Sequence, residues 1–328
     1  MTPREIVLAN LEHAGPPRPG FTFSGGRLND MVIAGLGPSA TYRQRRWTQG
    51  SREYYDDEWG NVWVRMVVGP QSGEVHEPAL KDWDRLDSLR RPDWHDSRRY
   101  EPMRRAFAAA GDKFRAAFLP GWVFATSRYL RKMENYFPDL IDCRPQIDRL
   151  HGIVTDLLLG VIHNVARAGA DGIHFCEDLG VQDRPLIGPA MWREVFAPHY
   201  RRLTAAAHGH GMKVLMHSCG YNWALIDDLA DAGIDCFQFD QPAAYDLPAL
   251  AGKLRARRLS LWSPVDIQKH LPTGDRAIIQ REARRLVELF AGFLIVKNYP
   301  DLAGIGVRPE WDQWAYEAFL AAANVVPS

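Results

Sequence analysis

One stretch of the chain indicates both its fold and its candidate site: Met212-Lys213-Val214-Leu215-Met216-His217-Ser218-Cys219-Gly220. The apolar run 212–216 predicts a buried strand, and the polar residues after it predict the loop beyond. Side chains two positions apart on a strand point to the same face, so the imidazole of His217 and the thiol of Cys219 are expected to lie side by side. Such a pair is able to bind Zn²⁺ or to act as acid, base or nucleophile. Two ligands do not complete a metal site, so other segments have to supply the rest.

Helices and short apolar strands alternate on both sides of this stretch, from about residue 100 to the C-terminal region. The pattern predicts strands at 116–120, 172–176, 212–217, 234–239, 259–262 and 293–296, and helices at 101–112, 127–168, 189–210, 222–232, 246–256 and 275–291. Nearly unbroken apolar strands between helices are typical of parallel strands buried on both faces. The fold class is therefore α/β, and a (β/α)8 TIM barrel suits this length better than an open sheet. No glycine-rich phosphate fingerprint follows the first strand, which disfavours a dinucleotide-binding fold.

The first hundred residues follow a different pattern. A helix is expected at 4–13 and a short strand at 21–23, separated by a Gly/Pro-rich breaker. Alternating aromatic and polar residues over 52–78, interrupted by the turn 70–73, predict a β-hairpin. With the strand at 21–23, about seven barrel strands are found. We expect a single domain over 1–328, in which 1–100 form an N-terminal extension with the hairpin and 101–328 carry the regular repeats.

The composition excludes several classes of protein. The 40 basic and 40 acidic side chains balance, which argues against a nucleic-acid-binding protein. No apolar run is long enough to span a membrane, and the N-terminus does not have the pattern of a signal peptide. The four cysteines have irregular spacing and do not predict a disulfide framework. We therefore expect a cytoplasmic protein with reduced thiols.

Polar side chains follow most of the predicted strands. In a barrel of this kind, function collects at the carboxyl ends of the strands, where these side chains converge. The polar clusters at the strand ends are Glu177-Asp178, His217 with Cys219, Asp240-Gln241, Ser263 with Asp266 and Gln268, and Lys297-Asn298-Tyr299.

Several motifs, spread over most of the chain, make it resemble the uroporphyrinogen decarboxylase superfamily. They are Asp57-Glu58-Trp59-Gly60-Asn61, Arg128 with Met133-Glu134, Gly169-Ala170-Asp171-Gly172-Ile173 leading to Glu177-Asp178-Leu179-Gly180-Val181-Gln182, Pro185-Leu186-Ile187, Phe196-Ala197-Pro198, His217-Ser218-Cys219-Gly220, and Asp266-Ile267-Gln268 with Leu271-Pro272. The resemblance implies a (β/α)8 barrel with a cleft at the carboxyl ends of its strands. The superfamily contains tetrapyrrole decarboxylases and also zinc-dependent methyltransferases of corrinoid systems.

The arginine-rich motif of true uroporphyrinogen decarboxylases is missing from this chain. That motif, an Arg-Gln-Ala-Gly-Arg pattern, binds substrate carboxylates, and the corresponding region here reads Phe23-Ser24-Gly25-Gly26-Arg27-Leu28-Asn29-Asp30. Arg27 is a partial replacement, but one arginine is too few to bind the many carboxylates of a tetrapyrrole. The resemblance therefore favours the methyltransferase branch over the classical decarboxylase.

The methyltransferase branch uses a His-x-Cys pair and a distant cysteine near the last strands, often with a carboxylate. His217 and Cys219 match the pair, and Asp240 would supply the carboxylate. Tyr299 occupies the position of the distant cysteine, where its phenol would act on the substrate, replace the missing ligand or pack at the rim. One imidazole, one thiolate and one carboxylate are compatible with an open zinc site at His217, Cys219 and Asp240, and equally with a polar pocket that holds no metal.

Other residues near the predicted mouth are expected to act on the substrate, although each has an ordinary structural explanation as well. Glu177 and Asp178 would act as acid, base or substrate ligand, or else cap a helix. Arg128 would bind a carboxylate or phosphate, or form a surface salt bridge. The residues expected to contact substrate are Arg27, Trp122, Arg128, Gln182, Gln241, Asp266, Gln268 and Asn298.

We therefore expect an enzyme that transfers a methyl group to or from a small molecule. Zinc, methylcobalamin and a corrinoid-carrying protein are the cofactors and the partner that the resemblance implies, and an enzyme without cofactor fits as well. One alternative is a cofactor-independent decarboxylase, and another is a non-catalytic binding subunit. A homo-oligomer is compatible with all of these.

Overall fold

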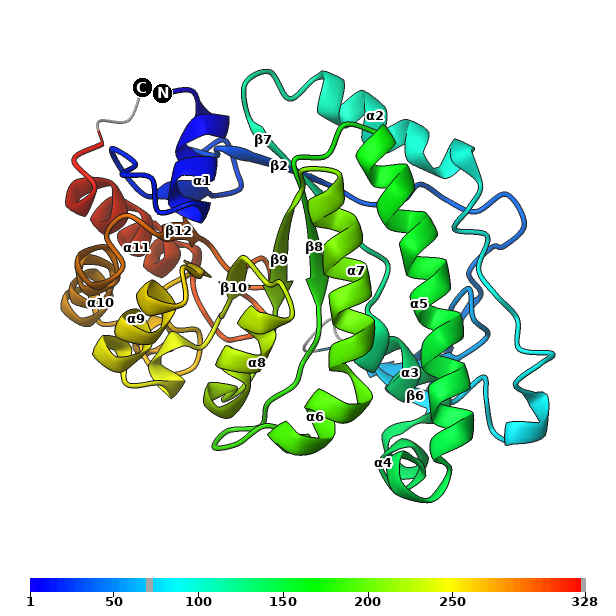
Figure 1. Cartoon of the computed structure of the whole chain (residues 1–328). Helices are drawn as coiled ribbons and strands as arrows, with labels where there is room; N and C mark the ends of the chain where they lie inside the picture. Colours follow the sequence, from blue (N-terminus) through cyan, green and yellow to red (C-terminus); the bar gives the residue numbers. More distant parts are fainter. Residues whose placement is uncertain (69–72, 326–328) are drawn as a thin grey trace.

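Eight parallel strands form the centre of the part of the chain that the structure, a computed structural model, describes, namely residues 1–68 and 73–325 (Figure 1). They pair in the order β1-β12-β11-β10-β9-β8-β7-β2, which nearly closes a barrel. The barrel strands are β1 (Gly20–Thr22), β2 (Met31–Ala34), β7 (Phe114–Phe118), β8 (Gly172–Cys176), β9 (Lys213–His217), β10 (Cys236–Gln238), β11 (Ser260–Ser263) and β12 (Leu294–Lys297). The predicted TIM barrel is confirmed.

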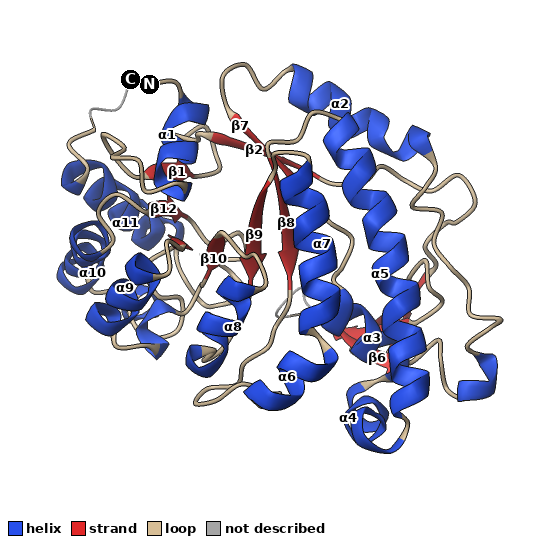
Figure 2. Cartoon of the chain, in the orientation of Figure 1, coloured by secondary structure: helices blue, strands red, loops and turns tan. Residues whose placement is uncertain are grey.

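Helices surround the strands (Figure 2). The α-helices are α1 (Pro3–Leu11), α2 (Glu101–Ala108), α3 (Val123–Arg131), α4 (Met133–Asp142), α5 (Arg144–Arg167), α6 (Pro189–Val195), α7 (Ala197–Gly209), α8 (Ile226–Asp231), α9 (Leu247–Ala256), α10 (Arg276–Leu289) and α11 (Pro309–Ala322). Short 3₁₀ helices cover Trp83–Arg85, Ser97–Tyr100, Trp223–Leu225, Pro242–Ala244 and Leu271–Thr273. Among the described residues, no helix has the length and apolar character needed to cross a lipid bilayer.

The structure differs from the predicted elements in three places. The eighth barrel strand is β2, which the sequence pattern did not reveal because it is only 4 residues long and partly exposed. The helix predicted at 189–210 is two helices, since Pro198 has no N–H to donate and lies in the first turn of α7. The C-terminal helix α11 was not predicted.

The predicted hairpin is confirmed and is part of a larger antiparallel sheet. Within the described segments this sheet has four strands, in the order β3 (Arg46–Gln49), β4 (Arg52–Asp56), β5 (Val62–Met66) and β6 (Glu74–Glu77). Residues 70–72 of the predicted turn lie outside the described residues. Tyr55 pairs with Trp63, and Tyr54 pairs with Trp47. Because neighbouring residues on a strand face opposite ways, these two aromatic pairs lie on opposite faces of the sheet.

The amino-terminal end of the barrel is filled by apolar side chains. Val7 and Leu11 of α1 pack there against a buried cluster of inward-facing strand residues, Met31, Phe114, Ala116, Leu215, Cys236, Trp262 and Ile295. In Figure 1 the strands β8 and β9 run away from the end of the barrel at which α1 lies. The helix therefore closes one end, and the carboxyl ends of the strands form the other.

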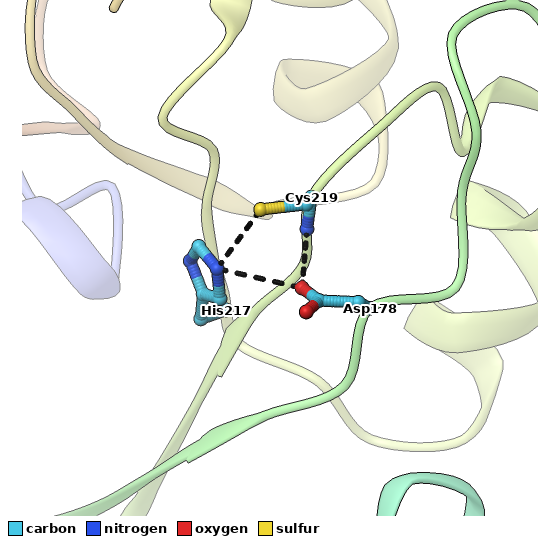
Figure 3. A group of neighbouring side chains, drawn as sticks. All are labelled: Asp178, His217 and Cys219. Carbon is cyan, nitrogen blue, oxygen red and sulfur yellow. Dashed lines mark hydrogen bonds and ion pairs between the residues drawn. The ribbon is translucent and has the colours of Figure 1, made fainter. Parts of the chain in front are cut away.

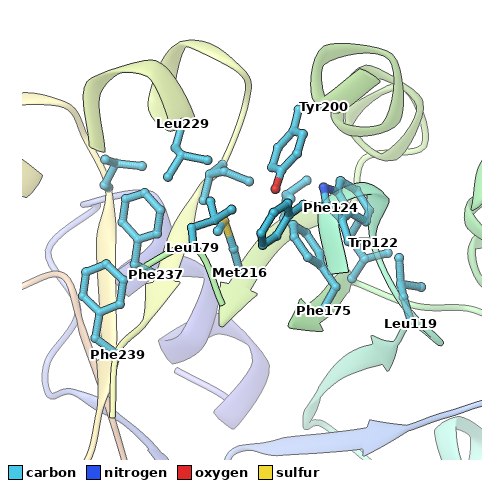
Figure 4. Close-up of a cluster of buried hydrophobic side chains, with 14 of the residues drawn as sticks. Leu119, Trp122, Phe124, Phe175, Leu179, Tyr200, Met216, Leu229, Phe237 and Phe239 are labelled. Atoms are coloured by element: carbon cyan, nitrogen blue, oxygen red, sulfur yellow. The ribbon is translucent and has the colours of Figure 1, made fainter. Parts of the chain in front are cut away.

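The larger core lies between the outer faces of the strands and the surrounding helices. Figure 4 shows part of it, where Trp122, Phe175 and Tyr200 lie together. The rings of Trp122 and Phe175 are stacked 3.7 Å apart, and the ring of Tyr200 meets Trp122 edge-on. Burial of such large rings is a major source of the stability of the barrel.

A buried ion pair joins the segments before and after β1. The carboxylate of Asp30 is not exposed, and it accepts hydrogen bonds from Arg18 Nη1 at 2.6 Å and Nη2 at 2.9 Å. It also accepts one from the backbone N–H of Phe21 at 2.8 Å. The backbone N–H of Asp30 donates to the carbonyl of Phe21. These bonds fix the connection between β1 and β2, the two strands at the ends of the pairing order.

We predict that Asp30→Ala lowers the free energy of unfolding by about 3 kcal/mol, because it leaves the largely buried guanidinium of Arg18 without its partner. Urea denaturation measures the change. Asp183→Ala is the control, since Asp183 and Arg184 form an exposed pair and its loss is expected to cost less than about 1 kcal/mol. Equal losses in the two variants would contradict the prediction.

Candidate active site

Three side chains from two neighbouring strand ends converge at the mouth of the barrel. Asp178 follows β8, His217 ends β9, and Cys219 lies two residues later (Figure 3). One donor atom of each residue lies within 4.8 Å of the other two. His217 Nε2 is 3.4 Å from Cys219 Sγ and 3.6 Å from Asp178 Oδ1. In the part of the chain that the structure describes, no other three His, Cys, Asp or Glu side chains have their donor atoms within 4.8 Å of one another.

These distances fit a tetrahedral zinc ion. Ligand bonds of about 2.0–2.3 Å at tetrahedral angles place neighbouring nitrogen, oxygen and sulfur donors about 3.3–3.7 Å apart. The pairs His217–Cys219 and His217–Asp178 both meet that spacing. The donor set of one imidazole, one thiol and one carboxylate also suits zinc. Three protein ligands leave a fourth position open, as in catalytic zinc sites.

Asp240 lies behind the imidazole of His217. Its Oδ2 is 3.9 Å from His217 Nδ1, and its Oδ1 accepts a hydrogen bond of 2.7 Å from Lys297 Nζ. The side chains of Asp240 and Lys297 are 5% and 8% exposed, so the pair is buried. The contact is too long for a hydrogen bond, and His217 Nδ1 has no hydrogen-bond partner, so Asp240 acts on the ring through its charge. This arrangement differs from the expected ligand set, because Asp178 takes the position beside Nε2 and Cys219 that we expected for Asp240.

Glu177 connects the two strand ends to helix α3. Its side chain is fully buried, and its two oxygens accept hydrogen bonds from the backbone N–H groups of Phe124 and Ala125, at 2.9 and 2.8 Å. Its own backbone N–H donates to the carbonyl of His217. Burial raises the pKa of Glu177 to about 8, against the effect of the two N–H donors. Glu177 therefore occupies the cap position that was the structural alternative for this residue.

Helix α3 brings a guanidinium to the edge of the cluster. Arg128 Nη2 is 4.0 Å from Asp178 Oδ2 and donates a hydrogen bond of 3.1 Å to Tyr129 Oη. The side chain of Arg128 is 10% exposed, and its Nε has no hydrogen-bond partner. A guanidinium in this position adds positive charge beside Asp178.

The loop after β9 is held in one shape by close backbone packing. Gly220 has φ +79°, and a Cβ on it would overlap the carbonyl oxygen of Gly180, so a larger residue does not fit. Gln241 Oε1 accepts a hydrogen bond from Gly220 N at 2.9 Å. Cys219 N donates to Asp178 Oδ1 at 2.9 Å. The thiol of Cys219 and the carboxylate of Asp178 are thereby fixed next to each other.

The thiols at the mouth are held in their neutral form by the protein itself. Burial, followed by the charges of Asp178 and Asp240, raises the pKa of Cys219 well above its usual value. The same causes raise the pKa of Cys176 to about 12. A cation bound to Cys219 would reverse this effect, because metal coordination deprotonates a thiol.

Comparison with known proteins identifies the family. The family model described as uroporphyrinogen decarboxylase (URO-D) matches residues 63–310, most of the chain. The chain belongs to the uroporphyrinogen decarboxylase family. A methyltransferase from Methanosarcina mazei has a similar structure, with a TM-score of 0.61 and 17% sequence identity, over 81% of this chain and 76% of that chain. A D-psicose 3-epimerase solved in the presence of D-fructose has a TM-score of 0.43 at 10% identity, over 74% of this chain and 86% of that chain.

These comparisons confirm the family resemblance. The likeness to the methyltransferase supports the barrel fold, and the likeness to the epimerase is too weak to carry an argument. No curated protein matches the chain in sequence.

A cavity of about 470 Å³ opens inside the barrel of this uroporphyrinogen decarboxylase family member. Its polar and aromatic lining includes His174, Gln238, Trp262, Lys297 and Asn298. His174 Nε2 is 3.1 Å from Gln238 Oε1, while its buried Nδ1 has no hydrogen-bond partner. His174, Gln238 and Trp262 were not among the predicted site residues. The period of two on a strand was the available signal, since Gln238 lies two residues before Asp240 and His174 four before Asp178.

The remaining predicted residues lie in varied surroundings. Tyr299 has its ring 5.9 Å from Lys297 Nζ, and Asn298 bonds to Ser24 through its side-chain amide. Arg27 pairs with Asp312 of α11 at 2.7 Å. Trp122 is buried in the core, and Gln182 and Gln268 are exposed.

Asp266 is buried and accepts hydrogen bonds from three backbone N–H groups of the loops around it. The donors are Ala243, Gln268 and Lys269. These bonds give Asp266 a structural role in the turn.

We predict a pH dependence of stability that comes from His174. Burial, with the charges of His217 and Lys297, lowers the pKa of His174 from 6.5 to about 3. Between these two values the unfolded state binds a proton that the folded state does not, so stability falls as the pH falls. From about pH 7 to about pH 5, the wild type is expected to lose about 2 kcal/mol more than His174→Gln.

Urea denaturation at the two pH values measures this difference. The exposed His95 provides the control variant, His95→Gln, which is expected to follow the wild type. If His174→Gln loses as much stability as the wild type on acidification, the prediction is wrong.

Proposed function

We propose that this protein is a zinc-dependent methyltransferase that moves a methyl group between a small molecule and a corrinoid. The observation that carries the proposal is the convergence of Asp178, His217 and Cys219 at the zinc-like spacing of 3.4 and 3.6 Å. Family membership supports an enzyme whose site lies at the barrel mouth. The corrinoid, alone or on a carrier protein, is the partner that the sequence resemblance to zinc-dependent methyltransferases of corrinoid systems implies.

Asp178, His217 and Cys219 would hold the metal. Zinc in such a site acts as a Lewis acid that lowers the pKa of a sulfur or oxygen nucleophile in the open position. Asp240 would orient His217 through its charge beside Nδ1, and Lys297 would neutralise the second oxygen of Asp240. Lys297 already neutralises the charge of Asp240. The carboxylate of Asp178 would therefore offset the positive charge of the metal.

The cavity inside the barrel would hold the reacting end of the small-molecule substrate. Its volume, about 470 Å³, lies in the usual range for ligand pockets. His174 Nδ1 is a buried acceptor that has no protein partner, so a donor group on the substrate would satisfy it. Trp262 and Phe118 would provide apolar contact beside it.

A metal-free decarboxylase is the alternative that the side chains of the cavity inside the barrel would support. Its support is the neutral His174 and the Lys297 ammonium in one cavity, groups able to bind a carboxylate substrate and exchange protons with it. The zinc content of the purified protein distinguishes the two proposals.

We predict that the purified protein contains about one zinc ion per chain by mass spectrometry of the metal, and that His217→Ala and Cys219→Ala do not retain it. Cys143→Ala is the matched control. Cys143 is a free cysteine at the start of α5 and outside the cluster, so zinc is expected to stay bound. Zinc-free wild type with activity insensitive to chelators would contradict the metal proposal and favour the decarboxylase.

We further predict that Asp240→Asn weakens zinc binding or slows methyl transfer from methylcobalamin about 10–100-fold, because it removes the carboxylate that orients His217. Competition with a chromophoric chelator and the change in the cobalamin absorption spectrum measure the two effects. Asp228→Asn, on α8, is the control for loss of a carboxylate elsewhere. An unchanged affinity and an unchanged rate in Asp240→Asn would remove the orienting role.

A further inference from the structure

A second cavity near the site lies outside the barrel, between the antiparallel sheet and helix α3. Its volume is about 540 Å³. Six aromatic rings form much of its wall: Tyr55, Trp59, Trp63, Trp94, Phe118 and Tyr129. We call this cavity the aromatic cleft.

The rings of the aromatic cleft are arranged mostly edge to face. Trp63 and Tyr129 lie 4.7 Å apart at an interplanar angle of 63°, and Trp59 and Trp94 lie 5.5 Å apart at 89°. Walls at steep angles offer both ring faces and ring edges to a guest. A flat aromatic molecule is able to stack on one wall and to receive edge contacts from the other, which are the two favourable geometries of aromatic pairs.

The charged groups that line the cleft already form hydrogen bonds or ion pairs within the protein. Asp57 accepts hydrogen bonds from Trp63 Nε1 at 2.7 Å and from Asn61 Nδ2 at 2.8 Å, as well as from backbone N–H groups. Glu58 receives two hydrogen bonds from Arg99, at 2.7 and 2.6 Å. A charged ligand would have to compete with these bonds, so the cleft favours an uncharged one.

The aromatic cleft is connected to the zinc-like cluster through helix α3. Tyr129 Oη accepts a hydrogen bond from Arg128 Nη2, and the same nitrogen lies 4.0 Å from Asp178 Oδ2. The hydroxyl of Tyr129 both accepts and donates, so it retains a proton for an acceptor on the ligand. Phe118 lines both the aromatic cleft and the cavity inside the barrel, and its side chain is partly exposed. The two cavities therefore adjoin at Phe118.

We propose that the aromatic cleft binds a planar, uncharged aromatic molecule that carries an oxygen acceptor, with its ring against the wall that the contacting rings of Trp63 and Tyr129 form and the oxygen bonded to the Tyr129 hydroxyl. Resting on the proposed function, this assigns the class of small molecule that takes part in methyl transfer. The ring lies in the cleft, and its substituent extends along Arg128 towards Asp178. A volume of about 540 Å³ accommodates a molecule of this kind.

Coumarin is a suitable probe, because it is flat, uncharged and carries carbonyl and ring oxygens. Titration of the full-length protein, followed by ligand-observed NMR, gives its Kd. We expect Trp63→Ala to weaken binding about tenfold and Tyr129→Phe to weaken it about threefold, since the first removes a stacking wall and the second one hydrogen bond. Trp63→Phe keeps a ring at this position and is expected to retain most of the affinity.

Trp47→Ala is the matched control for loss of a tryptophan. Trp47 belongs to the same sheet but stacks on Tyr54, on the opposite face. The Kd for coumarin is expected to stay unchanged. Equal Kd values in Trp63→Ala and Trp47→Ala would overturn the proposal. Tetramethylammonium provides a second comparison, because aromatic walls also bind such cations. Tighter binding of tetramethylammonium than of coumarin would overturn the assignment of an uncharged ligand.

The same titration with His217→Ala separates this proposal from the proposed function. The cleft contains no residue of the cluster, so coumarin is expected to bind this variant as it binds the wild type. If the wild type binds zinc but not coumarin, the cleft assignment fails and the metal site stands. If it binds coumarin at Trp63 but no zinc, the cleft stands and the zinc-dependent function fails.

Discussion

The carboxylate of Glu177 is the interaction on which the geometry of the mouth depends. It is buried, and it accepts hydrogen bonds from N–H groups in the first turn of α3. The backbone N–H of the same residue donates a hydrogen bond to the carbonyl of His217. An acidic group at a helix N-terminus is stabilised by the N–H groups directed at it. The ends of β8 and β9 and the start of α3 therefore form one rigid unit. Asp178, His217 and Arg128 all take their positions from this unit.

The two aspartates at the mouth, Asp178 and Asp240, have different cationic neighbours. Lys297 forms a buried ion pair with Asp240, at 2.7 Å, while Asp178 is 40% exposed and its guanidinium neighbour Arg128 is 4.0 Å away. A carboxylate with a close cationic partner is a poorer metal ligand than one without. Breaking a buried pair of this kind is costly, because it leaves an uncompensated charge in the interior. Asp178 is thus the aspartate beside His217 that has no close cationic partner.

The sequence predicted the barrel, which the structure confirms, and the side-by-side placement of His217 and Cys219, because both follow from local patterns. Period-two alternation put His217 and Cys219 on one face, and apolar strands between helices indicated parallel pairing. The choice between Asp178 and Asp240 depends on Lys297, which lies 57 residues beyond Asp240 and reaches it only through the fold. Asp266 and Gln268 lie in loops, where no periodicity predicts which way a side chain points. The aromatic cleft was missed for a similar reason, since its rings come from segments that meet only in space.

The apolar cluster under α1, which closes the amino-terminal end of the barrel, has a consequence for the order in which reactants bind. With Val7 and Leu11 packed into the amino-terminal end, the cluster is approached from the carboxyl ends of the strands. Two reactants that both need the cluster must then share one entrance. The reactant that enters first then lies deeper in the barrel and leaves only after the second has left. In kinetic terms, a barrel closed at one end is suited to binding in a compulsory order.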